Sequence, residues 1–146
     1  MLKIFLDADV LMASAASSSP NSAGQVPLSL SEVTLIDATT SGMVVEECKR
    51  NIPTVFEHSD KVQMTFRQIV NRALDVVDRP TRETVQAYRP YAAWSDAPHL
   101  ASASEHACRY LVTYNLSDYN LSDLDDIEVA EPDTVVRLVR TKLADL

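Results

Sequence analysis

Short runs of apolar residues alternate along the chain with longer stretches in which apolar residues recur every three or four positions. The first run covers residues 2–6, is apolar except for Lys3, and ends at Asp7. A run of this kind is typical of a strand buried on both faces of a parallel sheet. Similar runs at residues 33–36, 73–77, 110–113 and 127–130 predict four further strands, and the brevity of 73–77 suggests an edge strand.

Between these runs the spacing predicts amphipathic helices, several of them preceded by residues that favour N-cap positions. The candidate caps are Asp9 for the first helix, one of Thr39, Thr40 and Ser41 for the second, and Thr81 for a later one. The predicted helices cover residues 10–17, 42–51, 54–71 as one or two helices, 83–88, 97–110 and 132–143. Residues 25–31 are ambiguous and are given at most one helical turn.

Strands and helices therefore alternate almost strictly, which predicts an α/β fold with a parallel sheet and right-handed crossovers. We expect one three-layer α/β/α domain over residues 1–146, with a mainly parallel sheet of four to five strands. A chain of this length can bury a sizeable core. In such a sheet, reactive groups gather where strands end and helices begin.

Composition narrows the function classes. The two glycines exclude glycine-rich phosphate loops, and no apolar run reaches the about 18 residues of a membrane span. We therefore expect a soluble, cytoplasmic protein, with Cys48 and Cys108 as buried thiols. The net charge of −8 argues against a general polyanion binder, but basic residues including Arg50 gather between positions 49 and 89 and could attract a phosphate backbone.

Acidic residues occur where the predicted strands end and helices begin. Two carboxylates about 4 Å apart repel by about 4 kcal/mol at an effective dielectric of about 20, so a cluster of them requires a cation. Oxygen ligands favour Mg²⁺ or Mn²⁺, and such a site suits metal-assisted phosphodiester hydrolysis. The candidates are Asp7, Glu47, Asp96 and Asp118.

Each acid also has a simpler explanation. Most Asp and Glu side chains are solvated surface groups, and Asp96 or Asp9 can serve only as a helix cap. Spacing alone leaves both interpretations open.

Four segments favour the metal site. KIFLDADVL at the N-terminus, VVEECKRNI in the middle, and DAPHLASA followed by LVTYNLSDY together resemble the PIN domain, a family of metal-dependent ribonucleases that includes VapC-type toxins. The resemblance covers the whole chain. It implies a compact parallel sheet flanked by helices, a Mg²⁺ or Mn²⁺ site, and cleavage of RNA by activated water. It also suggests an antitoxin protein and a second copy of the chain as partners.

The resemblance assigns roles residue by residue. Asp7 matches the first acid of the family and Asp96 the third. Glu47 matches the second, with neighbouring Glu46 as the alternative if the helix is rotated. These acids would hold the metal and carry the catalysis.

The fourth position is less complete. Asn115 stands where the family has an acid or Asn, and Asp118 precedes an aromatic residue, so Asp118 must supply the carboxylate if four are needed. Thr113 either orients a water or phosphate through its hydroxyl or simply ends the strand. We assign Thr113, Asn115 and Arg50 to substrate binding.

Several residues near the motifs carry two interpretations. Asp9 stands where the family more often has Asn, and we favour a capping role. His99 lies one turn from Asp96, and packing is favoured over contact with substrate. Trp94 and Tyr91 are similarly expected to pack in the core rather than to stack on a base.

The leading hypothesis is a metal-dependent endoribonuclease that acts as the toxin of a toxin and antitoxin pair. A PIN-fold binding module that cleaves little and acts through a protein partner is the alternative, motivated by the acidic charge and by Asn115. A hydrolase of another phosphate substrate, such as structured DNA, is the third hypothesis.

Overall fold

The chain was analysed as a computed structural model that describes residues 2–17, 23–32, 35–121, 124 and 126–145. The described residues form a five-stranded sheet in the order β3-β2-β1-β4-β5, and every pair of neighbouring strands is parallel. This confirms the predicted α/β fold. The strands are β1 (Lys3–Leu6), β2 (Asp37–Ser41), β3 (Asp75–Val77), β4 (Tyr110–Val112) and β5 (Glu128–Ala130).

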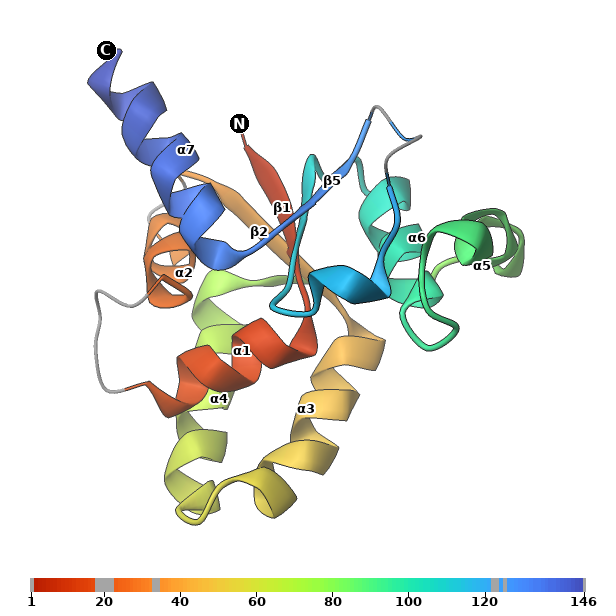
Figure 1. Cartoon of the computed structure of the whole chain (residues 1–146). Coiled ribbons are helices and arrows are strands. Elements are labelled where there is room, and N and C mark those ends of the chain that lie inside the picture. The colour runs from red at the N-terminus through yellow and green to blue at the C-terminus, as the bar shows by residue number, and fades with distance from the viewer. Residues whose placement is uncertain (1, 18–22, 33–34, 122–123, 125, 146) are drawn as a thin grey trace.

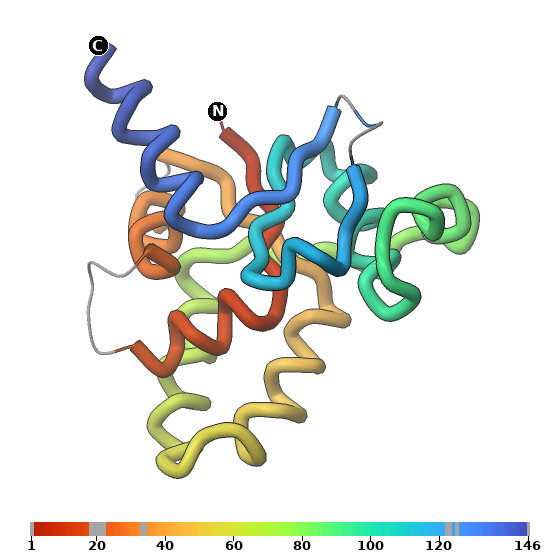
Figure 2. The backbone as a smooth tube through the Cα atoms, viewed as in Figure 1, coloured from red at the N-terminus to blue at the C-terminus, as the bar shows by residue number. Residues whose placement is uncertain are grey.

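Helices cover both sides of the sheet, with α5 and α6 on one side and α2 and α7 on the other (Figure 1). The amino end of β1 and the carboxyl end of α7 lie at the same end of the molecule, whereas α1 and α3 extend from the other end (Figure 2). The helices are α1 (Ala8–Ala16), α2 (Gln25–Glu32), α3 (Gly42–Val55), α4 (Ser59–Ala73), α5 (Arg82–Tyr88), α6 (Ala97–Glu105) and α7 (Pro132–Ala144), with short 3₁₀ helices η1 (Arg89–Tyr91) and η2 (Leu116–Asp118).

The core lies on the two central strands. Ile4, Phe5 and Leu6 of β1 are completely buried, as are Leu111 and Val112 of β4. A strand buried on both faces requires this continuous apolar run, so the sequence reveals β1 directly. The edge position of β3 is also as predicted.

Strand β2 is not where the apolar run predicted it. Residues 33–34 lie outside the described residues, and Leu35 and Ile36 form a bend that precedes the strand. The strand itself has the polar sequence DATTS, and its Thr39, Thr40 and Ser41 are buried. The Thr40 hydroxyl donates to the Leu6 carbonyl at 2.8 Å, which makes a buried hydroxyl tolerable.

Of the three candidate caps for α3, Ser41 takes the role, because its hydroxyl accepts from the Val44 amide at 3.2 Å. Pro53 does not end this helix, which continues to Val55 rather than stopping at residue 51. Helix α2 is also longer than the single turn expected for residues 25–31.

Helix α6 ends earlier than the spacing predicted. Ala107 adopts a φ of 56°, and its amide donates to the Ser104 carbonyl at 3.1 Å while the Cys108 amide donates to Ala103 at 2.9 Å. These two bonds form a Schellman motif, which closes the helix before β4 begins. The left-handed residue costs more as Ala than as Gly, so the sequence carries no obvious stop signal here.

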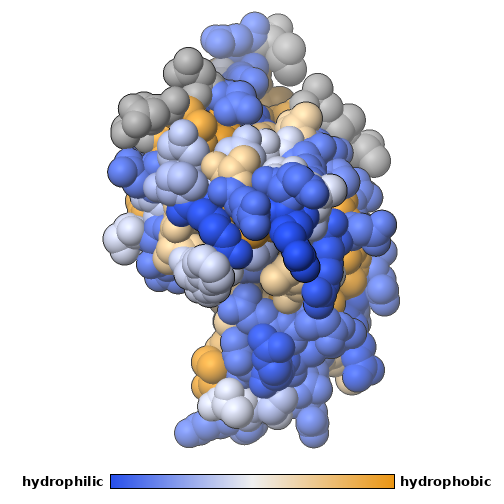
Figure 3. Space-filling view, turned by 90° about the vertical axis from the view of Figure 1, so that its right-hand side faces the viewer, coloured by the Kyte–Doolittle hydropathy of each residue, from blue (hydrophilic) through white to orange (hydrophobic). Residues whose placement is uncertain are grey.

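The short helix α5 follows the prediction, and Thr81 caps it by accepting from the Thr84 amide at 3.2 Å. No residue of α5 is buried, and the face of the molecule on this side is mostly hydrophilic (Figure 3). Cys48 and Cys108 are buried free thiols, as predicted. Within the described residues, no helix combines the length and apolarity needed to span a bilayer.

Candidate functional site

The candidate site lies at the carboxyl end of the sheet, between β1 and β4. The chain leaves β1 toward β2 on one side and reaches β4 on the other, so the strand order reverses between these two neighbours. Ligands of open parallel sheets bind at such a switch point. Asp7 follows β1 and Thr113 follows β4, and the Asp7 amide donates to the Val112 carbonyl at 3.0 Å.

Asp7 is fixed by three neighbours. Its Oδ1 accepts from the Ala8 amide at 2.7 Å, which makes Asp7 the N-cap of α1. Its Oδ2 accepts from the Thr113 hydroxyl at 3.0 Å, and the Tyr119 hydroxyl lies 3.5 Å away. Asp7 is only 7% exposed, and its position at the N-terminus of α1 directs its carboxyl group toward the positive end of the helix dipole.

Asp9 is not the N-cap of α1, because the helix begins at Ala8 and Asp7 takes that position, but its Oδ1 does accept from the Val10 amide of the first turn at 2.7 Å. It lies in the first turn of α1, where its Oδ2 accepts from the Tyr114 backbone amide at 2.9 Å and from the Asn115 side-chain Nδ2 at 3.1 Å. Burial, and then the charge on Asp7, raise the pKa of Asp9. Asp9 therefore anchors the loop after β4 to α1.

The structure separates the two adjacent glutamates of α3. Glu46 is exposed and its Oε1 lies 3.5 Å from Lys49 Nζ. Glu47 is half-buried and its Oε2 lies 3.8 Å from His99 Nε2. Glu47 is therefore the glutamate that faces the site. Arg50, assigned to substrate binding from the sequence, is exposed on the same helix.

His99 is buried as predicted, and its ring stacks on Phe5 with 6.3 Å between ring centroids. However, its Nε2 faces the acids, at 3.9 Å from Asp7 Oδ1. One ligand atom from each of Asp7, Glu47 and His99 lies within 4.8 Å of the others. From the sequence, packing is favoured for His99 over contact with substrate, and its position one turn after Asp96 is the signal that could have suggested a place beside the acids.

Asp96 occupies the N-cap position of α6, but its side chain makes no capping hydrogen bond. The simple capping explanation therefore fails for this residue. Burial, and then the charge on Asp7, raise the pKa of Asp96 to about 6, with Asp118 and Glu47 acting in the same direction and His99 opposing them. All these groups therefore act on one carboxyl group.

The loop that carries Asp118 is tied to the loop that precedes Asp96. Ala92 and Tyr119 form an antiparallel bridge, and the Ala93 amide donates to the Asp118 carbonyl at 2.7 Å. The Asn115 side chain donates to Asp9, as described above, and the charge of Asp118 is among those that raise the pKa of Asp96. Burial raises the pKa of the Tyr119 phenol far above its ordinary value, with nearby acids adding to the shift.

Thr113 is completely buried, and its hydroxyl lies 3.0 Å from Asp7 Oδ2 and 3.2 Å from Asp9 Oδ2. A hydroxyl has one proton, so it donates to one of these carboxylates at a time. The hydroxyl oxygen of Thr113 also accepts from the Asn115 backbone amide at 3.1 Å. Thr113 therefore positions the two aspartates and the start of the loop.

The aromatic residues before Asp96 differ from each other. Tyr91 is half-buried and packs against the core, as predicted. Trp94 is 75% exposed, so the core position predicted for it is wrong. The Arg89 guanidinium carbon lies 3.3 Å from the centroid of the Trp94 ring, a cation–π contact that holds the ring at the surface.

The donor set fits a divalent cation. Carboxylate oxygens are ligands for Mg²⁺ and Mn²⁺, and an imidazole nitrogen suits Mn²⁺ and related transition metals. Asp7 and His99 are buried, so their polar atoms require a partner more strongly than surface groups do. These residues could therefore hold the metal that the sequence predicted.

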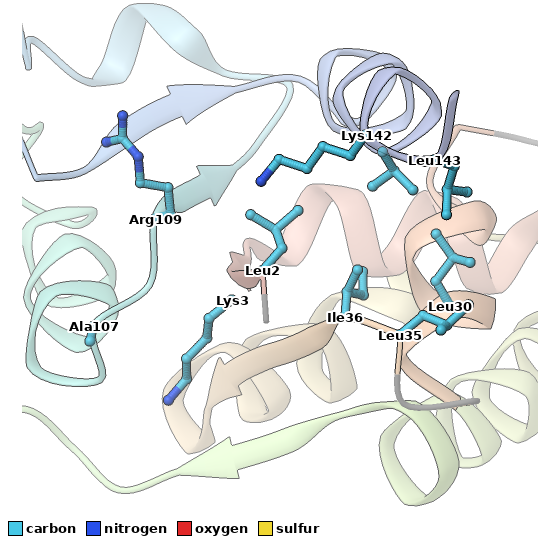
Figure 4. A pocket seen from close by; sticks show the side chains of 10 residues that line it. Leu2, Lys3, Leu30, Leu35, Ile36, Ala107, Arg109, Lys142 and Leu143 are labelled. Atoms are coloured by element: carbon cyan, nitrogen blue, oxygen red, sulfur yellow. The ribbon is translucent and has the colours of Figure 1, made fainter. Parts of the chain in front are cut away.

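A cavity of about 560 Å³ lies elsewhere, at the amino ends of the strands. In Figure 4, Leu30, Leu35 and Ile36 gather on one side of it and Lys142 extends from α7 toward Leu2. Its lining contains no acid, so it is distinct from the acidic site.

Comparisons with known proteins agree on the fold. No protein-family model and no curated protein matches the chain. PAE2754 from Pyrobaculum aerophilum has a similar structure at a TM-score of 0.65 and 14% identity, covering 95% of this chain and 90% of its own.

Two further structures come from toxin systems. VapBC2 from Rickettsia felis, solved with a DNA fragment from its promoter, matches at a TM-score of 0.64 and 12% identity over 88% of this chain and 97% of that one. VapC20 from Mycobacterium tuberculosis, a toxin that cleaves the sarcin–ricin loop, matches at a TM-score of 0.52 and 13% identity. The match covers 74% of this chain and 86% of that one. The resemblance to VapC-type PIN domains is thus confirmed at the level of the fold.

Proposed function

With a fold shared with VapC toxins, we propose that this chain is a Mg²⁺- or Mn²⁺-dependent endoribonuclease and the toxin of a toxin and antitoxin pair. The observation that carries the proposal is the convergence of Asp7, Glu47 and His99 at the switch point of the sheet, with the charges of Asp7 and Glu47 also acting on Asp96. These residues face one another although they come from three separate segments of the chain. Surface acids that serve only solubility do not require such an arrangement.

Asp7, Glu47, Asp96 and Asp118 would hold the cation. A bound Mg²⁺ or Mn²⁺ offsets the negative charge of a phosphodiester and makes a water molecule more acidic. The water oxygen attacks phosphorus, the bond from phosphorus to the leaving ribose oxygen breaks, and that oxygen takes up a proton. A carboxylate of the site would accept the proton that the water loses.

The neighbouring residues complete the mechanism. Thr113 and Asp9 hold Asp7 and the loop after β4 in place through the hydrogen bonds described above. Trp94 presents an exposed aromatic ring two residues before Asp96, in the turn closed by the hydrogen bond from the Asp96 amide to the Ala93 carbonyl. An exposed ring of this kind supports a single-stranded nucleic acid as substrate, because bases stack on aromatic side chains. Asn115 and Arg50 stay assigned to substrate binding.

The test is cleavage of RNA and of DNA of the same sequence, each with Mg²⁺, with Mn²⁺ or with a chelator. We expect metal-dependent cleavage of RNA that Asp96→Asn abolishes while the circular dichroism spectrum stays unchanged. Asp37→Asn is the matched control, because Asp37 is also an acid with a raised pKa but lies at the amino end of the sheet. Undiminished cleavage by Asp96→Asn would remove that residue from the mechanism.

The toxin role has its own test. Expression of the chain in a bacterial host should arrest growth, and expression of Asp96→Asn should not. A small reading frame for a DNA-binding protein directly upstream would supply the antitoxin, and its product should relieve the arrest. If the chain binds such a protein but cleaves no RNA with any metal, it is the binding module instead.

A further inference from the structure

His99 contributes a nitrogen to a site otherwise made of oxygen donors. Its Nε2 lies 3.9 Å from Asp7 Oδ1 and 3.8 Å from Glu47 Oε2. Both separations exceed the about 3.2 Å limit of an ordinary N–H to O hydrogen bond. They are, however, shorter than about 4.2 Å, twice a metal–ligand distance of about 2.1 Å and so the span between opposite ligands of one cation.

The burial of His99 needs an explanation that hydrogen bonding does not supply. The side chain is only 5% exposed, and its Nδ1 has no hydrogen-bond partner among the described residues. Packing on Phe5 and the backbone of α6 hold the ring in place. A buried polar ring without hydrogen bonds is costly. In the neutral tautomer that carries its proton on Nδ1, the Nε2 lone pair points at two carboxylates and is repelled by them unless a positive centre lies between.

We propose that His99 Nε2 binds the same cation as Asp7 and Glu47, and that this nitrogen makes the site select Mn²⁺ over Mg²⁺. Imidazole is a good ligand for Mn²⁺ and later transition metals, whereas Mg²⁺ takes oxygen ligands and retains its waters. The inference rests on the proposed function only in placing a cation at these acids. It does not depend on RNA as the substrate.

The decisive experiment is pulsed electron paramagnetic resonance of Mn²⁺ bound to the intact protein. Mn²⁺ bound through His99 should show modulation from a directly coordinated ¹⁴N nucleus. His99→Gln should lose that signal, and calorimetry should show about a tenfold weaker affinity for Mn²⁺ with less than about a threefold change for Mg²⁺. His106→Gln is the matched control, because His106 lies at the far end of α6, outside the cluster, and should leave both results unchanged.

Bound Mn²⁺ without nitrogen coupling in the wild-type protein would overturn the inference, even if His99→Gln failed to fold. Equal losses of Mn²⁺ and Mg²⁺ affinity in a folded His99→Gln variant would overturn the selectivity. The two proposals fail separately. RNA cleavage without nitrogen coupling removes only the role of His99, and nitrogen coupling without RNA cleavage removes only the ribonuclease.

Discussion

Acidic residues meet at both ends of the sheet, but their surroundings differ. At the amino end, Asp37 lies beside Asp75, and burial followed by that contact raises the pKa of Asp37, while the positive charge of Lys3 opposes the shift. At the carboxyl end, the charges that act on Asp96 come from three acids and from His99, with no Lys or Arg among them. The amino end thus compensates its acids with a lysine of the protein, whereas at the carboxyl end the proposed metal ion would take that role.

The two ends also differ in where an apolar cavity lies. The larger hollow with an apolar lining is at the amino end, where Lys3, Arg109 and Lys142 are among its lining residues. The carboxyl end instead brings together buried and half-buried groups that could bind a metal. Charge and strand order therefore identify the candidate metal site, whereas the size of a cavity does not.

The largest difference between the two ends should follow from neutralising one acid at each. Glu47→Gln should lower metal-dependent RNA cleavage by about 100-fold or more, because even residues that only support metal ligands cost about 10- to 100-fold. Asp37→Asn at the amino end and Glu46→Gln on the same helix should leave cleavage within about twofold. Initial rates at saturating Mn²⁺ measure the effect, and equal losses in Glu47→Gln and Glu46→Gln would mean that Glu47 has no special position.

The second largest difference should be in the stability lost when one buried hydroxyl group is removed at each end. Thr113→Val removes a buried hydroxyl that bonds to the Asp7 side chain and leaves a buried oxygen without this donor, so the free energy of unfolding should fall by about 1 to 3 kcal/mol. Ser31→Ala at the amino end removes a partly buried hydroxyl bonded to the Ala73 carbonyl at 2.6 Å, and should cost about 1 kcal/mol. Urea denaturation measures both. Thr113→Ser keeps the hydroxyl and should recover most of the loss; no recovery would assign the effect to packing instead.

Removing an exposed apolar side chain at each end should have a smaller effect, seen in the KM for RNA. Trp94→Ala should raise the KM for RNA about tenfold, within the about 1 to 3 kcal/mol that stacking on one base contributes, with little change in kcat. Trp94→Phe should retain part of this binding. Leu143 is 52% exposed beside the amino-end cavity, and Leu143→Ala should not change KM. A lower kcat with an unchanged KM in Trp94→Ala would argue against stacking.

The smallest effect is the pH dependence of stability without metal. The pKa of Asp96 is about 6 in the folded protein against an ordinary 3.8, so the folded state binds the proton more tightly. The resulting stabilisation is fully present below about pH 3.8 and is lost as the pH rises through about 6. The melting temperature of wild type relative to Asp96→Asn should therefore fall by about 2 to 5 °C between pH 4.5 and 7.5.

Mn²⁺ should act in the opposite direction, because it binds the deprotonated carboxylate and so stabilises the folded protein more at pH 7.5. A difference between wild type and Asp96→Asn that is constant across this pH range would contradict the raised pKa. Asp37→Asn serves as the control for general effects of removing one negative charge.

The parts of this arrangement that the sequence revealed are those set by local pattern. The apolar run of β1 places Asp7, and the helical spacing after Asp96 places α6. The composition of Thr39, Thr40 and Ser41 is that of caps, so the sequence places β2 too early; pairing with β1 and β3, together with the bond from Thr40 to Leu6, makes them a buried strand.

The remaining errors concern side chains whose surroundings come from distant segments. Asp9 was taken for a cap because its partners, Tyr114 and Asn115, lie more than 100 positions away in the chain. Trp94 is 75% exposed and one face of its ring contacts the Arg89 guanidinium, a contact that hydropathy does not reveal. His99 carries a packing signal and a ligand signal at once, and only the approach of Glu47 from α3 reveals the second.

The most direct test of the central claim is a crystal structure with bound Mn²⁺, located by its anomalous scattering. The account predicts one strong anomalous peak at the carboxyl end of the sheet, within bonding distance of Asp7 and Glu47, that disappears in Asp7→Asn. A peak at the amino end beside Asp37 and Asp75, or no peak near Asp7 at saturating Mn²⁺, would contradict it.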